Sequence, residues 1–132
     1  MRNTTLSLNR ILNIKRNIEN PLTAWEIITK NGLTKKAALN IADLLSMSMK
    51  ELSALLPTSD RTLQRYKKSD SIPADVSERL VKLGLITINA YKIFKNKHSV
   101  VDWLHEPNIA LEGLKPINIM NIRKIKRDRF YR

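Results

Sequence analysis

The stretch Thr58-Ser-Asp-Arg-Thr-Leu-Gln-Arg-Tyr-Lys67 decides the fold that this sequence predicts. Leu63 and Tyr66 are three residues apart, so they would lie on one face of a helix and pack inward. Ser59 stands where the N-cap of that helix is expected. Four polar side chains would then point mostly outward: Arg61, Thr62, Gln64 and Arg65. The stretch therefore predicts a short amphipathic helix with a polar outer face.

A second short helix is predicted directly before it. Ser48 would cap a helix from Met49 to Leu56, and Glu51 completes the pattern of a capping box. The inner face of this helix would carry Leu52, Leu55 and Leu56. Two such helices joined by a tight turn form a helix-turn-helix, here at about residues 48–67. An ordinary pair of short amphipathic helices in any helical protein would show much the same pattern.

The outward residue types suit DNA. The second helix of a helix-turn-helix lies in the major groove, where Arg and Gln can each make two hydrogen bonds to guanine or adenine. Thr and Lys side chains would hold the phosphate backbone. The predicted DNA-binding residues are Ser59, Arg61, Thr62, Gln64, Arg65, Lys67 and Lys68. Because one short helix reads little DNA, we expect a homodimer on a two-fold operator.

The composition favours a small helical protein with a polyanionic partner. The chain has 132 residues, of which 42% are hydrophobic and 27% charged, and only three are Gly. This length fits one compact unit or two very small ones sharing a core. The formal net charge is +12, from 24 Lys and Arg against 12 Asp and Glu. Such an excess implies nucleic acid or an acidic protein surface as the partner.

Several classes of chemistry are not expected. The chain has no cysteine and two histidines, His98 and His105, so disulfides, thiolate metal sites and a structural zinc are not predicted. No set of paired carboxylates, catalytic triad or phosphate-binding loop can be assembled, so we expect neither an enzyme nor a cofactor. No run approaches about 20 apolar residues, and the N-terminus has no long apolar segment, so we expect neither a membrane span nor a secretory signal. We therefore expect a cytoplasmic protein that does not bind membranes.

The N-terminal segments predict further helices. Residues 1–20 form an irregular basic arm leading into a short helix, which either covers the core or contacts phosphate or a second subunit. Residues 22–31 form an amphipathic helix that ends at Gly32 and places Trp25 in the core. Thr34 would cap the next helix. The inward positions of that helix are Ala38, Ile41, Ala42 and Leu45.

A polar connection at residues 69–73 predicts a seam between two regions. Residues 1–68 would form the N-terminal helical region, and residues 74–132 a C-terminal helical region. The latter begins with a long helix that runs from Ala74 to about Lys95 and is interrupted at Gly84. Its additional apolar positions are Leu85, Ile86 and Ile88, which either form a dimer interface or are buried within one chain.

The segments after the long helix predict short elements. Ser99 would cap a brief helix that ends before Pro107. Residues 108–115 form a loop in which Gly113 permits a turn, and Pro116 begins the last helix. His105 would favour the C-terminus of its helix. The sequence thus predicts an all-α fold: a small helical bundle with a helix-turn-helix, followed by a helical C-terminal region.

Ordered pieces of the chain resemble a known family. Ser59-Asp-Arg-Thr-Leu-Gln-Arg65 resembles its Ser-x-x-Thr-Leu-x-Arg motif, and Ser77-Glu-Arg-Leu80 resembles the start of its long helix. Residues 90–94 resemble the Ala-x-x-x-Phe that closes this helix. Asp102-Trp-Leu-His-Glu-Pro-Asn-Ile-Ala-Leu-Glu-Gly-Leu-Lys-Pro116 is similar to its pattern of Trp-Leu, Pro-Asn, Leu, Gly and Pro. Over about residues 34–121 the chain resembles antitoxins of the Xre/MbcA/ParS type, in which an Xre-like helical region precedes a C-terminal toxin-binding region.

The resemblance implies a function in a type II toxin-antitoxin system. Such antitoxins neutralise a cognate toxin, often a RES-domain enzyme that degrades NAD, by docking their C-terminal region against its active site. They also tend to dimerise and to repress their own operon. In the family, the helix led by Pro continues through a Thr, a Gly and a further helix. Here Asn121 is followed instead by the basic sequence Ile-Arg-Lys-Ile-Lys-Arg-Asp-Arg-Phe-Tyr-Arg132.

We place the predicted toxin contact on the loop after Pro107 and on the basic tail. Two aromatic side chains would act as apolar anchors, and arginines would pair with acidic groups of the toxin. The predicted toxin-binding residues are Asn108, Leu111, Lys115, Arg127, Arg129, Phe130, Tyr131 and Arg132. In the alternative interpretations, the tail is solvated or adds phosphate contacts, or the whole protein is a stand-alone repressor whose C-terminal half only dimerises.

Overall fold

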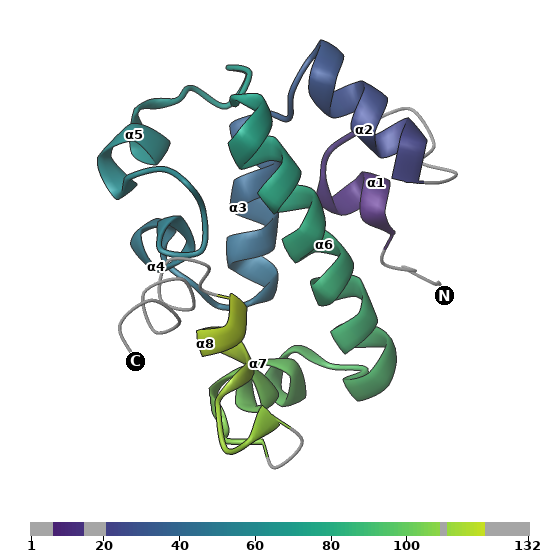
Figure 1. Cartoon of the computed structure of the whole chain (residues 1–132), viewed down its shortest axis with the longest axis vertical. Coiled ribbons are helices and arrows are strands. Elements are labelled where there is room, and N and C mark those ends of the chain that lie inside the picture. The colour runs from purple at the N-terminus through teal and green to yellow at the C-terminus, as the bar shows by residue number, and fades with distance from the viewer. Residues whose placement is uncertain (1–6, 15–20, 109–110, 121–132) are drawn as a thin grey trace.

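The computed structural model describes residues 7–14, 21–108 and 111–120 of the chain. Throughout these residues every regular element is a helix, which confirms the predicted all-α bundle (Figure 1). In chain order the helices are α1 (Leu8–Ile11), α2 (Pro21–Lys30), α3 (Lys35–Leu44), α4 (Met49–Ser53), α5 (Asp60–Arg65), α6 (Ala74–Phe94), α7 (Lys97–His105) and α8 (Pro116–Met120).

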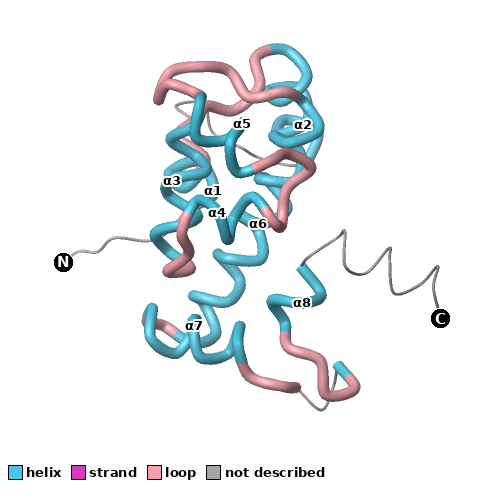
Figure 2. Tube along the Cα trace, turned by 90° about the vertical axis from the view of Figure 1, so that its left-hand side faces the viewer, coloured by secondary structure: helices cyan, strands magenta, loops and turns pink. Residues whose placement is uncertain are grey.

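The long helix α6 is the axis of the molecule. It packs along α3, while α1 and α2 lie on one side of this pair and α4 and α5 on the other (Figure 1). α7 and α8 pack against each other at the end of the molecule opposite α2 and α5 (Figure 2). The helix-turn-helix packs on α3, whereas the last two helices join the bundle through the contact between α7 and α6. They are therefore separate parts of one bundle.

The core between α3 and α6 follows the predicted helical spacing. The four inward positions expected on this part of the chain, Ala38, Ile41, Ala42 and Leu45, are all buried. The small alanine side chains let the two helices approach closely. Thr34 stands at the N-cap as predicted, but its side chain makes no capping hydrogen bond. The backbone of Thr34 pairs instead with that of Ser71, so the start of α3 is held by this bridge rather than by the hydroxyl.

α6 is not interrupted at Gly84, and that prediction was wrong. The helix continues through the glycine and ends only at Lys95, whose φ of 69° is left-handed. A Cβ at Gly84 would lie 3.0 Å from Cδ1 of Leu8 and 3.4 Å from Cδ2 of Leu12, so the glycine provides room for the α1 segment. Packing on this side offsets the low helix propensity of glycine, which costs about 1 kcal/mol.

The N-terminal segment covers the core within residues 7–14. Ile11 and Leu12 are buried, as the core-covering interpretation of the arm predicts. The basic residues before position 7 and those at 15–20 lie outside the described part of the chain, as does the side chain of Trp25. α2 ends before Gly32, as expected, and a Cβ there would lie 2.5 Å from the carbonyl oxygen of Ile72. Gly32 is therefore fixed both by its φ of +70° and by this close approach.

The connection at residues 69–73 joins the two predicted regions closely. The amide of Ile72 donates to the carbonyl of Leu33 at 2.7 Å, and the Ile72 side chain is buried. The hydroxyl of Ser77, also buried, accepts from the amide of Leu33 and donates to the carbonyl of Ile72, both at 3.0 Å. Residues on both sides of the connection thus share one core, and the division at 68 and 74 stays a prediction.

The apolar surface of α6 differs in detail from the predicted one. Ile88 is buried, so for this residue burial within one chain is the correct interpretation. Leu85 remains 46% exposed, and Ile93, which the sequence did not single out, is 71% exposed. Because these two residues are eight positions apart, they lie within one broad side of the helix. None of the helices described is long and apolar enough to cross a membrane.

Candidate nucleic-acid interface

α4 is built on the predicted capping box. The Ser48 hydroxyl accepts from the amide of Glu51 at 3.1 Å, and the Glu51 carboxylate accepts from the amide of Ser48 at 3.0 Å. The backbone and side-chain hydrogen bonds from Ser48 lower the pKa of Glu51. The helix ends at Ser53 and not at the predicted Leu56, because residues 54–57 form a turn. The leucines at the end of the predicted helix, Leu55 and Leu56, are nevertheless buried.

α5 presents the predicted polar face. Its cap is Ser59, whose hydroxyl accepts from the amide of Thr62 at 3.0 Å. Leu63 is completely buried and Tyr66 is half-buried, so these two side chains hold the helix against the core as expected. The side chains predicted to point outward, Arg61, Thr62, Gln64 and Arg65, are all exposed. Their placement fits the DNA-contacting role, which stays a prediction.

The exposed side chains of α5 differ in whether they form hydrogen bonds within the chain. The hydroxyl of Ser59 also donates to that of Thr62 at 2.8 Å, so these two polar groups hold each other. Gln64 donates from Nε2 to the carboxylate of Asp60 at 2.5 Å. Arg61 and Arg65 form no hydrogen bond or ion pair through their side chains in the described part of the chain. Among the exposed side chains of α5, the two arginines are therefore those that no intramolecular contact of the described residues holds in place.

The two predicted phosphate-binding lysines lie beyond the helix. α5 ends at Arg65, and Tyr66 is extended with φ −62° and ψ 138°, so the helix does not reach Lys67 as the sequence predicted. The amide of Lys67 donates to the carboxylate of Asp70 at 2.8 Å, which closes a turn instead. The side chains of Lys67 and Lys68 are both exposed on this turn. They extend the positive surface of α5 at its C-terminal end.

Lys35, at the start of α3, is a residue that the sequence analysis missed. Its Nζ donates to the carbonyls of Gln64 and Tyr66, each at 3.0 Å. Carbonyls in the last turn of a helix lack partners within the helix and carry partial negative charge, which a lysine satisfies. Lys35 therefore holds the C-terminal end of α5. Nothing in the local sequence around Lys35 points to this contact, which spans 29 to 31 residues.

The loop predicted to contact a toxin is held by its own backbone. The amide of Asn108 donates to the carbonyl of Leu114 at 3.0 Å, and the carbonyl of Asn108 accepts from the amide of Gly113 at 2.9 Å. Gly113 has a φ of +81°, which confirms the predicted turn. Leu111 is half-buried and Lys115 is exposed, beside the exposed Leu114. Arg127, Arg129, Phe130, Tyr131 and Arg132 lie outside the described residues.

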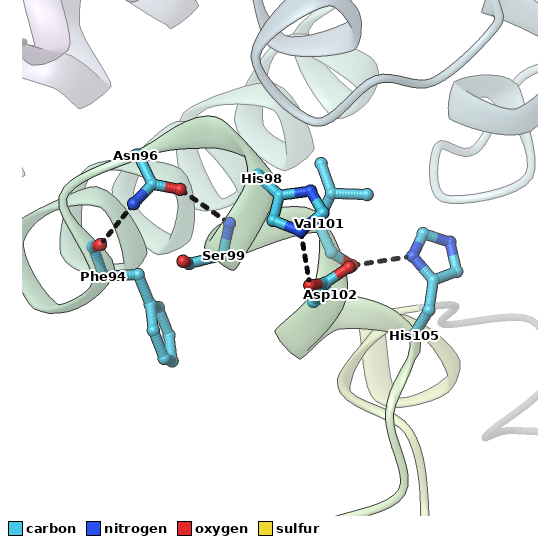
Figure 3. Close-up of polar contacts among 7 residues, drawn as sticks. All are labelled: Phe94, Asn96, His98, Ser99, Val101, Asp102 and His105. Carbon is cyan, nitrogen blue, oxygen red and sulfur yellow. Dashed lines mark hydrogen bonds and ion pairs between the residues drawn. The ribbon is translucent and has the colours of Figure 1, made fainter.

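α7 leads into this loop, and its cap differs from the prediction. Asn96 caps the helix by accepting from the amide of Ser99 at 2.9 Å, so Ser99 is not the cap (Figure 3). Both residue types suit an N-cap, and the helix gains almost a turn by starting at Lys97. Phe94 packs against Trp103 with ring centroids 5.6 Å apart, and Leu104 is buried.

The two histidines make local contacts on the surface of α7. Nε2 of His98 lies 3.2 Å from the carboxylate of Asp102, and Nδ1 of His105 lies 2.9 Å from the carbonyl of Val101 (Figure 3). His105 is thus in the last turn of its helix, as predicted. Across the described residues, no group of three or more His, Asp or Glu side chains could hold a metal ion.

A comparison with known protein families found a match for the part of the chain that contains the helix-turn-helix. Residues 25–83 match the family model described as the antitoxin Xre-like helix-turn-helix domain. This segment contains α3, α4 and α5 completely, together with most of α2 and the first part of α6. The chain matches no curated protein and no solved structure. Over residues 25–83 the chain is therefore similar to the Xre-type antitoxins, and the match supports that part of the resemblance.

Proposed function

We propose that this protein is the antitoxin of a type II toxin-antitoxin pair. It binds operator DNA through α5 and neutralises a cognate toxin through its C-terminal region. The observation that carries the proposal is the position of Arg61 and Arg65. Both are exposed and unpaired in the described part of the chain, on the second helix of a helix-turn-helix within the matched segment.

The DNA contact follows from the geometry of α5. Arg61 and Arg65 are four residues apart, so both can face the major groove from one side of the helix. The predicted role of each is a paired hydrogen bond to a guanine edge. Lys67 and Lys68, on the turn that follows, contact phosphates and position the helix. Gln64 can also hydrogen-bond to a base edge when that base takes the place of Asp60 as the acceptor for its side-chain amide.

A second copy of the chain completes the operator contact. α5 has six residues and is about 9 Å long, so one copy reads only a few base pairs. We assign the dimer contact to the side of α6 that carries Leu85 and Ile93, the two large apolar side chains exposed on this helix. Two recognition helices related by a two-fold axis then read two half-sites of the operator.

The toxin contact is assigned to the loop and to the sequence that follows α8. Leu114 and Lys115 give the loop an apolar tip beside a positive charge, and the backbone bonds of Asn108 hold its shape. The later residues Arg127, Arg129, Phe130, Tyr131 and Arg132 supply aromatic anchors and cations. An NAD-degrading RES-domain enzyme is the toxin class that the MbcA/ParS resemblance implies.

The proposal is tested by co-expression with the adjacent open reading frame. A tagged form of this protein is purified, and the bound protein is identified by mass spectrometry. We expect a stoichiometric partner that is toxic when expressed alone and harmless in the complex. Recovery of this protein alone, or with DNA only, would contradict the antitoxin function and favour a stand-alone repressor.

The contribution of the tail is tested separately by removing residues 122–132. We expect the shortened protein to lose neutralisation when it is titrated against the purified toxin. Lys30→Ala serves as a matched control, because it removes an exposed cation from α2, far from the loop in sequence. Full neutralisation by the shortened protein would assign the toxin contact to the loop alone.

A further inference from the structure

Arg79 joins two segments that are distant in sequence. Its Nε donates to the carbonyl of Leu55 at 3.1 Å, and its Nη2 donates to the carbonyl of Met120. Leu55 lies in the turn between α4 and α5, 24 residues away, and Met120 is the last residue of α8, 41 residues away. One side chain of α6 therefore contacts both the helix-turn-helix and the last described helix.

The environment of Arg79 is unusual for a charged side chain. The residue is half-buried, and in the described part of the chain its guanidinium has no carboxylate partner. Burial lowers the pKa of Arg79. The cost of burying the charge is offset by the hydrogen bonds to these two carbonyls, of which that of Leu55 lies in the turn after α4. The planar guanidinium holds its donors in a fixed fork, so it fixes the direction of both carbonyls.

We infer that Arg79 is a positioning residue that couples the turn of the helix-turn-helix to α8. Through it, DNA binding at α5 and protein binding at the C-terminal region change each other's affinity. The inference rests on the proposed function for the identity of the two ligands. The contacts also predict an effect that needs neither ligand: loss of the guanidinium loosens both segments together.

The coupling has a simple physical origin. A partner that moves α8 takes the Met120 carbonyl away from Arg79, and the half-buried guanidinium must then shift to find another acceptor. That shift also disturbs its bond to Leu55 and hence the position of α5. Such coupling is reciprocal, so DNA changes the affinity for the partner by the same factor as the partner changes the affinity for DNA.

Three variants of the full chain distinguish the coupling by Arg79 from an effect of charge alone and from a loss of folding. Arg79→Met removes both donors and keeps the apolar stem. Arg79→Lys keeps the charge but loses the fork, so it remains informative if the methionine variant does not fold. Lys82→Met is the matched control, because Lys82 is an exposed cation on the same helix and pairs with Glu78 of that helix at 3.5 Å.

The first measurement is amide hydrogen exchange without any ligand. In Arg79→Met we expect exchange to quicken about tenfold, the effect of losing a charged hydrogen bond, at the amides of both Leu56 and Asn118. Arg79→Lys should show a smaller increase at the same two places, and Lys82→Met none. Faster exchange in Arg79→Met at only one of these two amides, or at neither, would overturn the inference.

The second measurement follows amide resonances while the DNA duplex from upstream of the gene is added. In the wild type we expect shifts in both α5 and α8, whereas in Arg79→Met the α5 shifts remain and the α8 shifts disappear. Shifts confined to α5 in the wild type, or equal α8 shifts in the variant, would overturn the inference alone. No α5 shift in the wild type would contradict the proposed DNA binding and, with it, the coupling.

Discussion

The polar face of α5 and the loop after α7 offer contrasting surfaces at opposite ends of the molecule (Figures 1 and 2). α5 displays two exposed arginines, Arg61 and Arg65, on a helix held by the buried Leu63 and by Lys35. The loop displays Leu114, 50% exposed, on a turn held by its own backbone. A firmly anchored cationic helix suits a polyanion, whereas an exposed apolar tip suits a protein surface. The two surfaces therefore differ in the kind of partner that their chemistry favours.

The largest expected effect is on the free energy of unfolding, and it should differ between a buried leucine of α5 and an exposed leucine of the loop. Leu63→Ala should lower the free energy of unfolding by about 2–5 kcal/mol, because it leaves a cavity beneath α5. Leu114→Ala should change it by less than about 0.5 kcal/mol. Urea denaturation followed by circular dichroism measures both. Similar losses in the two variants would mean that the loop is as strongly packed as α5.

The next effect concerns base reading. Arg65→Ala should lose about 1–3 kcal/mol of discrimination between operator and random DNA, because a paired contact to a base is lost. Lys68→Ala should weaken both DNAs alike and lower the salt slope by about one unit. Lys115→Ala should leave DNA affinity unchanged. Fluorescence anisotropy at several salt concentrations gives all three results, and equal losses on both DNAs for Arg65→Ala would refute its role.

A smaller effect is expected at the support of α5. Lys35→Met should weaken operator binding by about 1 kcal/mol, because two carbonyls at the end of α5 lose their donor. Lys36→Met is the control, since it removes an exposed cation from the adjacent position of α3. The two variants are compared by anisotropy on the same duplex. If both lose the same affinity, Lys35 contributes only its charge.

An effect of similar size concerns the cap of α4, and its carboxylate part depends on pH. Ser48→Ala should cost about 1 kcal/mol of stability, as loss of an N-cap does. The pKa of Glu51 is lowered in the folded protein, so its stabilising contribution is present above its unfolded pKa and is lost as the pH falls through the folded one. The difference in Tm between wild type and Glu51→Ala should therefore be constant near neutral pH and shrink below about pH 4. A difference that stays unchanged at pH 3 would contradict this account.

The elements that the sequence predicted correctly depend on neighbours in the chain. The capping box of Ser48 and Glu51, the cap at Ser59 and the stop at Gly32 each follow from residues only a few positions apart. The same holds for the inward positions of α3, which follow from helical spacing. Local hydrogen bonds and periodicity suffice for such features, because they need no knowledge of which helices meet.

The features that the sequence did not reveal depend on tertiary contacts. Gly84 looked like a break in a helix and is instead the place where α1 approaches α6. Lys35 and Arg79 make hydrogen bonds to carbonyls 24 to 41 residues away, for which no local pattern exists. At the candidate DNA site the outward side chains were foreseen. The bond between Gln64 and Asp60, four residues apart, could also have been found from spacing.

The most direct test of the proposal that α5 binds DNA and the C-terminal region binds a toxin is to remove one of these two functions and measure both. The double variant Arg61→Ala/Arg65→Ala is measured for repression of a reporter under its own upstream region and for neutralisation of the co-expressed adjacent gene product. We predict that repression is lost while neutralisation remains complete, because the arginines belong to α5 and the proposed toxin contact lies beyond α7. Loss of both activities in a folded double variant, or retention of repression, would contradict the account.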